Sequence, residues 1–255
     1  MNPAWQNWLL ALSCYTRIPV ALRQVPRPRD LQRAGYWLPV VGWLVGGCAA
    51  LLYVFAGSLV PPLVAVLLVM ILPMLLTGAL HEDGLGDCCD GFFGSRDRGR
   101  VLEIMKDSRL GTFGLLGILT VLSLQFGYLR ALPGPLLPFL VLAAHSLSRL
   151  AALGLMHMLP YAGQPDGWTG RIAAGPRPAG LLPAAVAGLL PLALPPLRPV
   201  VWLVVPAVLL VTVLLGLWFR RRIGGYTGDC LGATQQVALL TVYAAGWLAV
   251  QPDGP

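Results

Sequence analysis

The sequence has little charge, and above all little acid. Only 11% of its 255 residues are charged and 11 are acidic, whereas 56% are hydrophobic and gathered in blocks that approach twenty residues. Such blocks exclude an ordinary soluble domain, because a bilayer core about 30 Å thick needs roughly 20 helical residues to cross it. The composition therefore predicts an all-α, polytopic transmembrane helix bundle, with residues 1–255 forming a single integral membrane domain.

Several familiar signals are missing as well. The five cysteines are scattered and odd in number, which argues against a disulfide framework. Cys88 and Cys89 are adjacent but lack the spaced second pair of a zinc site, so we interpret them as small packing residues. The chain contains no G-x-S-x-G elbow, no H-E-x-x-H helix and no G-x-x-x-x-G-K-[ST] loop, which leaves no obvious nucleophile or P-loop. No aromatic and basic recognition module is visible, and we expect no nucleic-acid partner.

Seven apolar segments predict about seven membrane-spanning helices. Proline and glycine mark many of their boundaries, which fits short turns between antiparallel neighbours. The predicted spans cover residues 36–58, 62–80, 111–132, 135–158, 180–197, 199–219 and 231–250.

Residues 1–35 form a different kind of segment. No basic region precedes their apolar part, so we expect no cleaved signal peptide. Trp5, Trp8, Leu9 and Leu12 recur at helical spacing. Two interpretations stay open, a helix along the membrane interface and a helix packed into the bundle.

The arginines predict an orientation. Five of them precede the first span, and positive residues near helix ends tend to stay in the cytoplasm. Counting crossings from a cytoplasmic N-terminus places segments 81–110, 160–179 and 220–230 inside too, where most of the other basic residues lie. We therefore expect an N-in, C-out protein. The net charge of +7 fits this bias together with attraction to anionic membrane lipid.

Acid is concentrated where the second predicted span ends, since seven of the eleven acidic residues lie within residues 82–107. On a helix, Asp83, Asp87 and Asp90 fall within an arc of about 60°. Three carboxylates on one face repel one another unless a cation lies between them, and oxygen ligands select Mg²⁺ or Mn²⁺. Glu82 points off this face, and we expect it to face water.

Residues 95–114, SRDRGRVLEIMKDSRLGTFG, predict an amphipathic helix on the cytoplasmic side. Val101, Leu102, Met105 and Leu110 are spaced to bury one face of it. A surface helix with local salt bridges is the alternative without a functional role.

Charges of both signs meet on this stretch. Glu103 and Asp107 are four residues apart and would share a helical face, where they could complete a metal shell or supply a base. Arg96, Lys106 and Arg109 could hold phosphate oxygens. Metal-binding carboxylates beside such side chains are the equipment of phosphoryl transfer, by direct attack of a substrate hydroxyl on a metal-bound diphosphate.

Three motifs carry a resemblance to a known family. They are YTRIPV (15–20), TGALHEDGLGDCCDGFFGSRDRGRVLEIMKDSRLGTFG (77–114) and GGYTGDCLGA (224–233). With them the chain resembles the adenosylcobinamide-GDP ribazoletransferases, the membrane-bound cobalamin (5′-phosphate) synthases.

The resemblance implies a Mg²⁺-dependent reaction, with Mn²⁺ as a substitute, in the bacterial cytoplasmic (inner) membrane with the site facing the cytoplasm. A ribose hydroxyl of α-ribazole or its 5′-phosphate would attack the cobinamide phosphate of adenosylcobinamide-GDP, and GMP would depart. The implied partners are these two small molecules and membrane lipid, and a homo-oligomer is compatible with the resemblance.

Transferred to this sequence, the resemblance and the chemistry together give a set of candidate residues. The predicted metal ligands are Asp83, Asp87, Asp90 and Glu103. The predicted catalytic residues are Asp90 and Asp107, the latter as general base or further ligand. The predicted substrate-binding residues are Arg17, Arg96, Lys106, Ser108, Arg109, Thr227 and Asp229.

Some polar residues keep two interpretations. The GGYTGD stretch with Thr227 and Asp229 is either a substrate-binding loop or a structural turn. His81 is expected to be either an interface residue or a neighbour of the metal site rather than a ligand, since imidazole is a poor ligand for Mg²⁺. His145 and Arg149 lie one turn apart within a predicted span, and they are either a functional site or a satisfied buried pair.

Two other functions are alternatives for a membrane protein with such an acidic motif. A CDP-alcohol phosphotransferase motif opens D-x-x-D-G, which Asp87 to Gly91 match, but Ala-Arg does not follow, the later spacing is short and Glu103 replaces an aspartate. A transporter predicts ionisable residues near mid-membrane in several helices, whereas these acids cluster at one edge.

Overall fold

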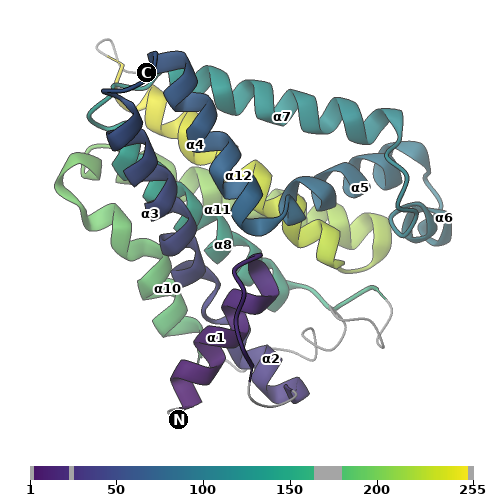
Figure 1. The fold of residues 1–255 in the computed structure, drawn as a ribbon. Helices are drawn as coiled ribbons and strands as arrows, with labels where there is room; N and C mark the ends of the chain where they lie inside the picture. The colour runs from purple at the N-terminus through teal and green to yellow at the C-terminus, as the bar shows by residue number, and fades with distance from the viewer. Residues whose placement is uncertain (1–2, 23–25, 164–179, 252–255) are drawn as a thin grey trace.

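The computed structural model describes residues 3–22, 26–163 and 180–251, and it confirms the predicted all-α architecture (Figure 1). Within those ranges the only β-type pairing is one isolated bridge between Tyr161 and Tyr226. Most of the predicted cytoplasmic segment 160–179 lies outside the described residues.

All seven predicted apolar segments contain helix. The helices are α1 (Pro3–Tyr15), α2 (Pro28–Gly35), α3 (Leu38–Ala56), α4 (Pro62–Thr77), α5 (Leu80–Gly94), α6 (Arg98–Ile104), α7 (Thr112–Ala131), α8 (Leu137–Met158), α10 (Leu181–Leu189), α11 (Val201–Ile223) and α12 (Gly228–Leu248), with two short 3-10 turns at Leu190–Ala193 and Pro195–Leu197.

Fewer helices than predicted are long and apolar enough to cross a membrane. Within the described residues α3, α7, α8 and α11 qualify, and the bent pair of α4 and α5 makes a fifth if it counts as one span. The predicted span 180–197 is broken, because α10 has 9 residues and proline-containing 3-10 turns follow it. α12 is long enough, but its first half carries Thr234, Gln235 and Gln236. The orientation stays a prediction.

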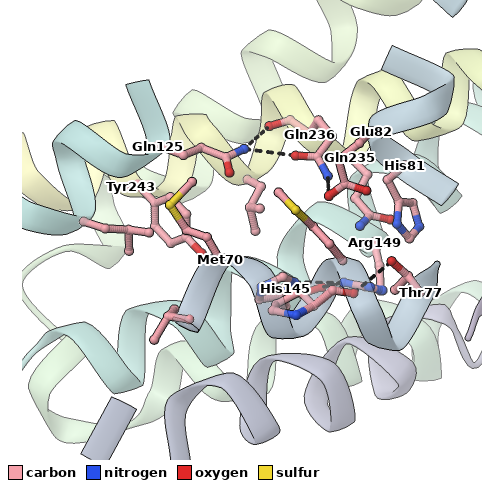
Figure 2. A pocket seen from close by; sticks show the side chains of 15 residues that line it. Met70, Thr77, His81, Glu82, Gln125, His145, Arg149, Gln235, Gln236 and Tyr243 are labelled. Carbon is pink, nitrogen blue, oxygen red and sulfur yellow. Dashed lines mark hydrogen bonds between the residues drawn. The ribbon is translucent and has the colours of Figure 1, made fainter. Parts of the chain in front are cut away.

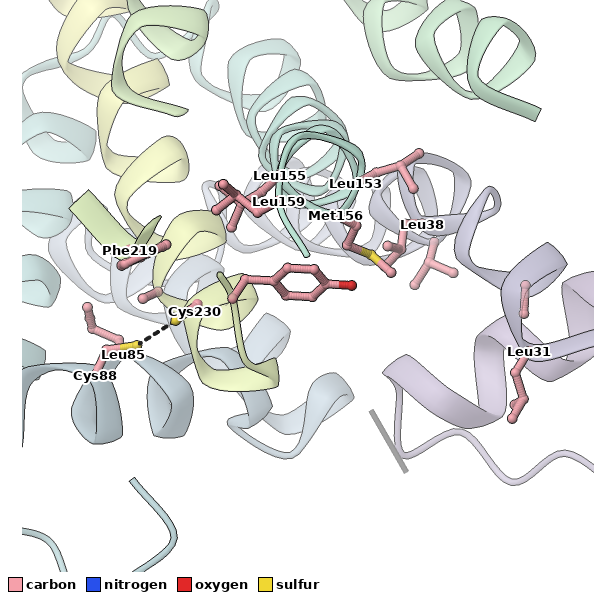
Figure 3. Packing of buried hydrophobic residues seen from close by; sticks show 14 of the residues in the cluster. Leu31, Leu38, Leu85, Cys88, Leu153, Leu155, Met156, Leu159, Phe219 and Cys230 are labelled. Carbon is pink, nitrogen blue, oxygen red and sulfur yellow. Dashed lines mark hydrogen bonds between the residues drawn. The ribbon is translucent and has the colours of Figure 1, made fainter. Parts of the chain in front are cut away.

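α8 forms the centre of the bundle, with α3 on one side and α12 on the other. A cluster of buried hydrophobic residues links the end of α8 to α5, α11 and α12, and Figure 3 shows Leu155, Phe219 and Cys88 among them. In that cluster the Sγ atoms of Cys88 and Cys230 are 3.9 Å apart. The interpretation of Cys88 as a packing residue is confirmed.

α1 packs into the molecule through Leu10 and Leu12, which are buried, and through Trp8, whose ring lies 5.7 Å from that of Trp37. Trp5, near its start, is exposed. The packed interpretation of this helix is therefore the one that the described residues support, with Trp5 left free for an interface.

The connection between α4 and α5 is the sharpest feature of the fold, since the two helices meet at an angle of 88°. Gly78 and Ala79 both adopt left-handed backbone, with φ of 67° and 56°. This conformation costs a non-glycine residue about 1 kcal/mol or more. The Arg17 side chain lies against Gly78, and the Arg17 amide donates to the Leu76 carbonyl over 2.7 Å. The bend turns the acidic helix α5 away from the line of α4.

Candidate active site

Helix α5 and the start of α12 approach each other closely because both carry glycine at the contact. A β-carbon on Gly84 would lie 3.0 Å from the Asp229 Cα, and one on Gly232 would lie 3.1 Å from the His81 carbonyl oxygen. This contact brings Asp229, from the third motif, to the acidic face of α5. The sequence places both segments among the candidates, but their contact depends on tertiary packing.

In the part of the chain that the structure describes, no positive side chain pairs with the carboxylates at this contact. Asp87 is half-buried, and the charges that act on it are those of Asp229, Asp83 and Asp90. Burial raises the pKa of the Asp229 carboxyl and Asp83 adds to that rise, whereas a hydrogen bond from Thr227 over 3.1 Å lowers it. Neither ion pair found among the described residues involves these acids. The arrangement is an uncompensated cluster of negative charge, which we call the acidic cluster (Asp83, Asp87 and Asp229).

The acidic cluster fits Mg²⁺ as part of a complex with substrate. In the described part of the chain no three His, Cys, Asp or Glu side chains are gathered tightly enough to enclose a metal by themselves. Mg²⁺ rarely uses such a cage, since it is usually held by one or two carboxylates together with water and substrate phosphates. Hard oxygen donors without a competing cation meet that requirement.

Asp90 is engaged differently. Its Oδ2 accepts a hydrogen bond from the Gly111 amide over 2.7 Å, and its Oδ1 accepts one from the Gly114 amide over 2.8 Å. These amides belong to the start of α7, where free N–H groups and the helix dipole favour a negative charge. The buried carboxylate of Asp90 therefore anchors α7 to α5, and its predicted role as ligand and catalyst stays a prediction.

This anchor gives a stability prediction. In Gly114→Ala the new methyl group would meet the Asp90 carboxylate, and losing these charge-assisted hydrogen bonds should lower the free energy of unfolding by about 2 kcal/mol. Thermal unfolding in detergent measures the loss. Gly127→Ala, also in α7, is the matched control because its β-carbon would meet nothing within 4 Å. Equal melting temperatures for the two variants would contradict the anchor.

The predicted amphipathic helix is shorter than expected. α6 ends at Ile104, so Asp107 lies beyond it and the expectation that Glu103 and Asp107 share a helical face is wrong. Asp107 instead accepts from the Arg109 amide over 3.1 Å, a local bond that competes with helix. Val101 and Met105 are buried as predicted, whereas Leu110 is exposed.

The charged residues around α6 pair with each other on the surface. Arg100 contacts Glu103 at 2.7 Å and Arg109 contacts Asp107 at 2.6 Å. Hydrogen bonds from Arg109 lower the pKa of the Asp107 carboxyl to about 2. In this arrangement Asp107 is a weak proton acceptor, because a base works best with a pKa near the working pH.

Among the remaining substrate-binding candidates, Thr227 is buried beside the acidic cluster and the others are exposed. Thr227 is buried and caps α12 by accepting from the Cys230 amide over 3.3 Å, so its turn is structural and also lies beside the acidic cluster. Arg17 is exposed at the bend before α5. Arg96, Lys106 and Ser108 are exposed on the segments that flank α6, and in the described part of the chain they form no ion pair or hydrogen bond with the acidic cluster.

Arg222 has a role that the sequence did not reveal. Its guanidinium donates to the carbonyl oxygens of Phe92 and Ser95 over 2.7 and 2.5 Å, at the end of α5. Arg222 lies in segment 220–230, whose basic residues contribute to the predicted orientation. In the structure it also caps the acidic helix α5, whose C-terminal end favours a positive charge.

A second polar group lies inside the bundle and corrects the expectation for Glu82. The Glu82 Oε1 accepts a hydrogen bond from the side-chain amide of Gln236 over 2.8 Å (Figure 2). The expectation that Glu82 faces water is therefore wrong. Arg149 is fully buried and donates to the His145 carbonyl over 3.0 Å. Glu82 and Arg149 attract one another across a cavity of about 20 Å³ that both line. The bend before α5 explains the difference, because it turns the first residues of that helix into the bundle.

Comparison with known proteins decides the family. A family model described as cobalamin-5-phosphate synthase matches residues 7–247, which is nearly the whole chain. The chain belongs to the cobalamin-5-phosphate synthase family. Membership makes it a transferase of cobalamin synthesis, and it does not favour the CDP-alcohol phosphotransferase alternative.

Curated members of the cobalamin-5-phosphate synthase family are similar over nearly their full length. A protein of Leptothrix cholodnii is 39% identical over 254 residues, covering 95% of this chain and 94% of the relative. A protein of Ralstonia pickettii is 40% identical over 93% of both chains, and one of Vibrio cholerae is 38% identical over 92% of this chain and 91% of its own. All three are named adenosylcobinamide-GDP ribazoletransferase. No solved structure matches.

Proposed function

We propose that this protein transfers the cobinamide phosphate of adenosylcobinamide-GDP to α-ribazole or its 5′-phosphate and releases GMP. A bond forms between a ribose oxygen and the phosphorus that carries cobinamide, and the bond from that phosphorus to the oxygen of GMP breaks. The ribose hydroxyl gives up its proton. The observation that carries the proposal is the acidic cluster, in which Asp229 joins Asp83 and Asp87 and no described residue supplies a positive partner. The names of the relatives supply the substrates.

The acidic cluster would hold Mg²⁺, with Mn²⁺ as a substitute. A bound Mg²⁺ would neutralise charge on the diphosphate as the phosphoryl group is transferred. The chain supports this position in two ways. Asp87 is half-buried, which strengthens its attraction for a cation. The glycine contact between α5 and α12 holds the carboxylates of the two helices beside each other.

The exposed side chains of Arg109, Lys106 and Arg96 would bind the donor. Arg109 now contacts Asp107, but an arriving diphosphate competes for the same guanidinium. Transfer of Arg109 to phosphate would let the pKa of Asp107 rise from about 2 towards its ordinary value. Asp107 would then be a better acceptor for the ribose proton, which agrees with its predicted role as general base. Lys106, Ser108 and Arg96 would add contacts to the diphosphate, and Glu103 stays a predicted ligand.

Arg109→Met tests the donor contact. We expect the KM for adenosylcobinamide-GDP to rise about tenfold, which corresponds to about 1.4 kcal/mol. The melting temperature should not change, because exposed ion pairs stabilise little. Arg100→Met removes the other exposed ion pair and is the control. An unchanged KM in Arg109→Met would remove this residue from the binding site.

The reaction itself is tested with purified protein in detergent. We expect GMP release only when adenosylcobinamide-GDP, α-ribazole and Mg²⁺ are all present. Release of CMP from a CDP-alcohol would support the alternative and overturn the proposal.

We further propose that the protein lies in the bacterial inner membrane with the acidic cluster at the cytoplasmic side. Labelling of Asp87→Cys by a membrane-impermeant thiol reagent from one side tests the orientation.

A further inference from the structure

A second cavity adjoins the acidic cluster. Its volume is about 170 Å³, and it lies where α1, α5 and α12 meet, with single residues of α3 and α8 closing it. Asp83 and Asp229 form one part of its wall. Apolar groups form most of the rest, among them Tyr15, Leu38 and Ala152. The cavity is therefore an apolar space with one acidic edge.

Two polar side chains in its wall have no hydrogen-bond partner among the described residues. His81 is 6% exposed and Gln235 is 3% exposed, so both are more than nine-tenths buried. The nitrogen and oxygen atoms of these two side chains are not among the fully buried unpartnered atoms of the described residues, so they remain accessible at the wall of a cavity. Both residues also line the smaller cavity beside Arg149, so they lie between the two spaces. A ligand within the larger cavity can therefore exchange a hydrogen bond with them.

The size of the cavity selects among the parts of the substrates. An engineered apolar cavity of about 150 Å³ binds benzene. A space of 170 Å³ therefore accepts one small aromatic ring system. It excludes the corrin macrocycle and a complete guanosine nucleotide. The base of a benzimidazole nucleoside is flat and largely apolar, and its one free ring nitrogen can only accept a hydrogen bond.

We propose that this cavity binds the aromatic base of the nucleoside acceptor, an inference that rests on the proposed function. The Gln235 amide and the His81 imidazole offer N–H donors for the free ring nitrogen. The ring packs against the apolar wall that Tyr15 and Leu38 provide. The attached ribose then extends to the acidic edge, where its hydroxyl faces the site of transfer between Asp83 and Asp229. His81 and Gln235 are thus specificity-determining residues that hold the acceptor rather than the donor.

Ala152→Leu tests the cavity by filling it. We expect the KM and the Kd for α-ribazole to rise at least about tenfold, or about 1.4 kcal/mol. The KM for adenosylcobinamide-GDP should stay within a factor of about two, since the donor would lie outside the cavity. Gly154→Ala is the control on the same helix, because a β-carbon there meets nothing within 4 Å. The Kd is measured by equilibrium dialysis of purified protein with α-ribazole alone.

Gln235→Leu is the second variant, since it removes the amide while keeping the size of the side chain. We expect the same selective rise for α-ribazole. Unchanged affinity for α-ribazole in either folded variant, or an equal loss for both substrates, would overturn the assignment. Failure of the proposed function has a different signature, namely no GMP release by the wild-type protein with α-ribazole. Active wild-type protein with insensitive variants contradicts only the cavity assignment.

Discussion

Asp87→Asn should lower the rate of GMP release by about 1,000-fold, equivalent to about 4 kcal/mol of transition-state stabilisation. Asp87 is a half-buried member of the acidic cluster, and the carboxylates that act on it are those of Asp229, Asp83 and Asp90. Asparagine has nearly the same shape but no charge, so it removes the attraction for a cation and relieves repulsion. We therefore expect the melting temperature to stay the same or rise while activity is lost.

Asp30→Asn is the matched control for this variant. The substitution makes the same chemical change at a residue of α2. The Asp30 carboxylate accepts a hydrogen bond from the Arg27 backbone amide over 3.1 Å, and an asparagine oxygen can still accept that bond. Its activity should remain near that of the wild-type protein. Wild-type turnover in Asp87→Asn would remove Asp87 from the metal site, and a large fall in its melting temperature would indicate a structural role instead.

Arg149→Met should lower the free energy of unfolding by about 3 kcal/mol, because it leaves a partly buried carboxylate, Glu82, without the positive charge that acts on it. Arg149 is fully buried and is the positive charge that acts on Glu82 inside the bundle. Without it the Glu82 carboxylate keeps the hydrogen bond from the Gln236 side chain but no positive charge, while its Oε2 has no partner among the described residues. Thermal unfolding in detergent gives the change.

The double variant Glu82→Gln with Arg149→Met separates charge from packing. If the loss comes from an unpaired carboxylate, removing that carboxylate should recover about half or more of the stability. Arg130→Met, at the exposed end of α7, is the control and should be neutral. No recovery in the double variant would show that Arg149 stabilises the bundle through packing and its bond to His145 alone.

Much of the fold follows from patterns within the sequence. Apolar length predicts where helices form, and all seven apolar segments contain one. The number of spans is harder to predict, because proline can break an apolar stretch and glycine can bend the chain. At Gly78 and Ala79 the backbone is left-handed, and the chain changes direction there between the end of α4 and the start of α5. Apolar composition alone does not contain that angle.

The residues of the candidate site were also predictable in part from patterns within the sequence. Helical spacing puts Asp83 and Asp87 on one face, and the third motif singles out Asp229. Their contact depends on Gly84 and Gly232, whose lack of side chains matters only once two distant helices are packed together. Helical spacing does not predict the environment of a carboxylate that accepts hydrogen bonds from residues distant in sequence.

Asp90 and Glu82 are the two clear cases of such partners. Asp90 lies on the predicted face but accepts from the Gly111 and Gly114 amides, which are more than twenty residues away. Glu82 was assigned to water from its angle on the helix, yet it meets Gln236 inside the bundle. In both cases the deciding partner is distant in sequence, so the periodicity of α5 carries no trace of it.

The metal site is tested most directly by titrating purified protein with Mn²⁺ in the presence of adenosylcobinamide-GDP and following free Mn²⁺ by electron paramagnetic resonance. We predict that the wild-type protein binds the cation and that Asp83→Asn, Asp87→Asn and Asp229→Asn each weaken this binding by about tenfold or more, whereas Asp30→Asn binds like wild type. Equal Mn²⁺ affinity in the wild-type protein and the three cluster variants would contradict the proposed metal site.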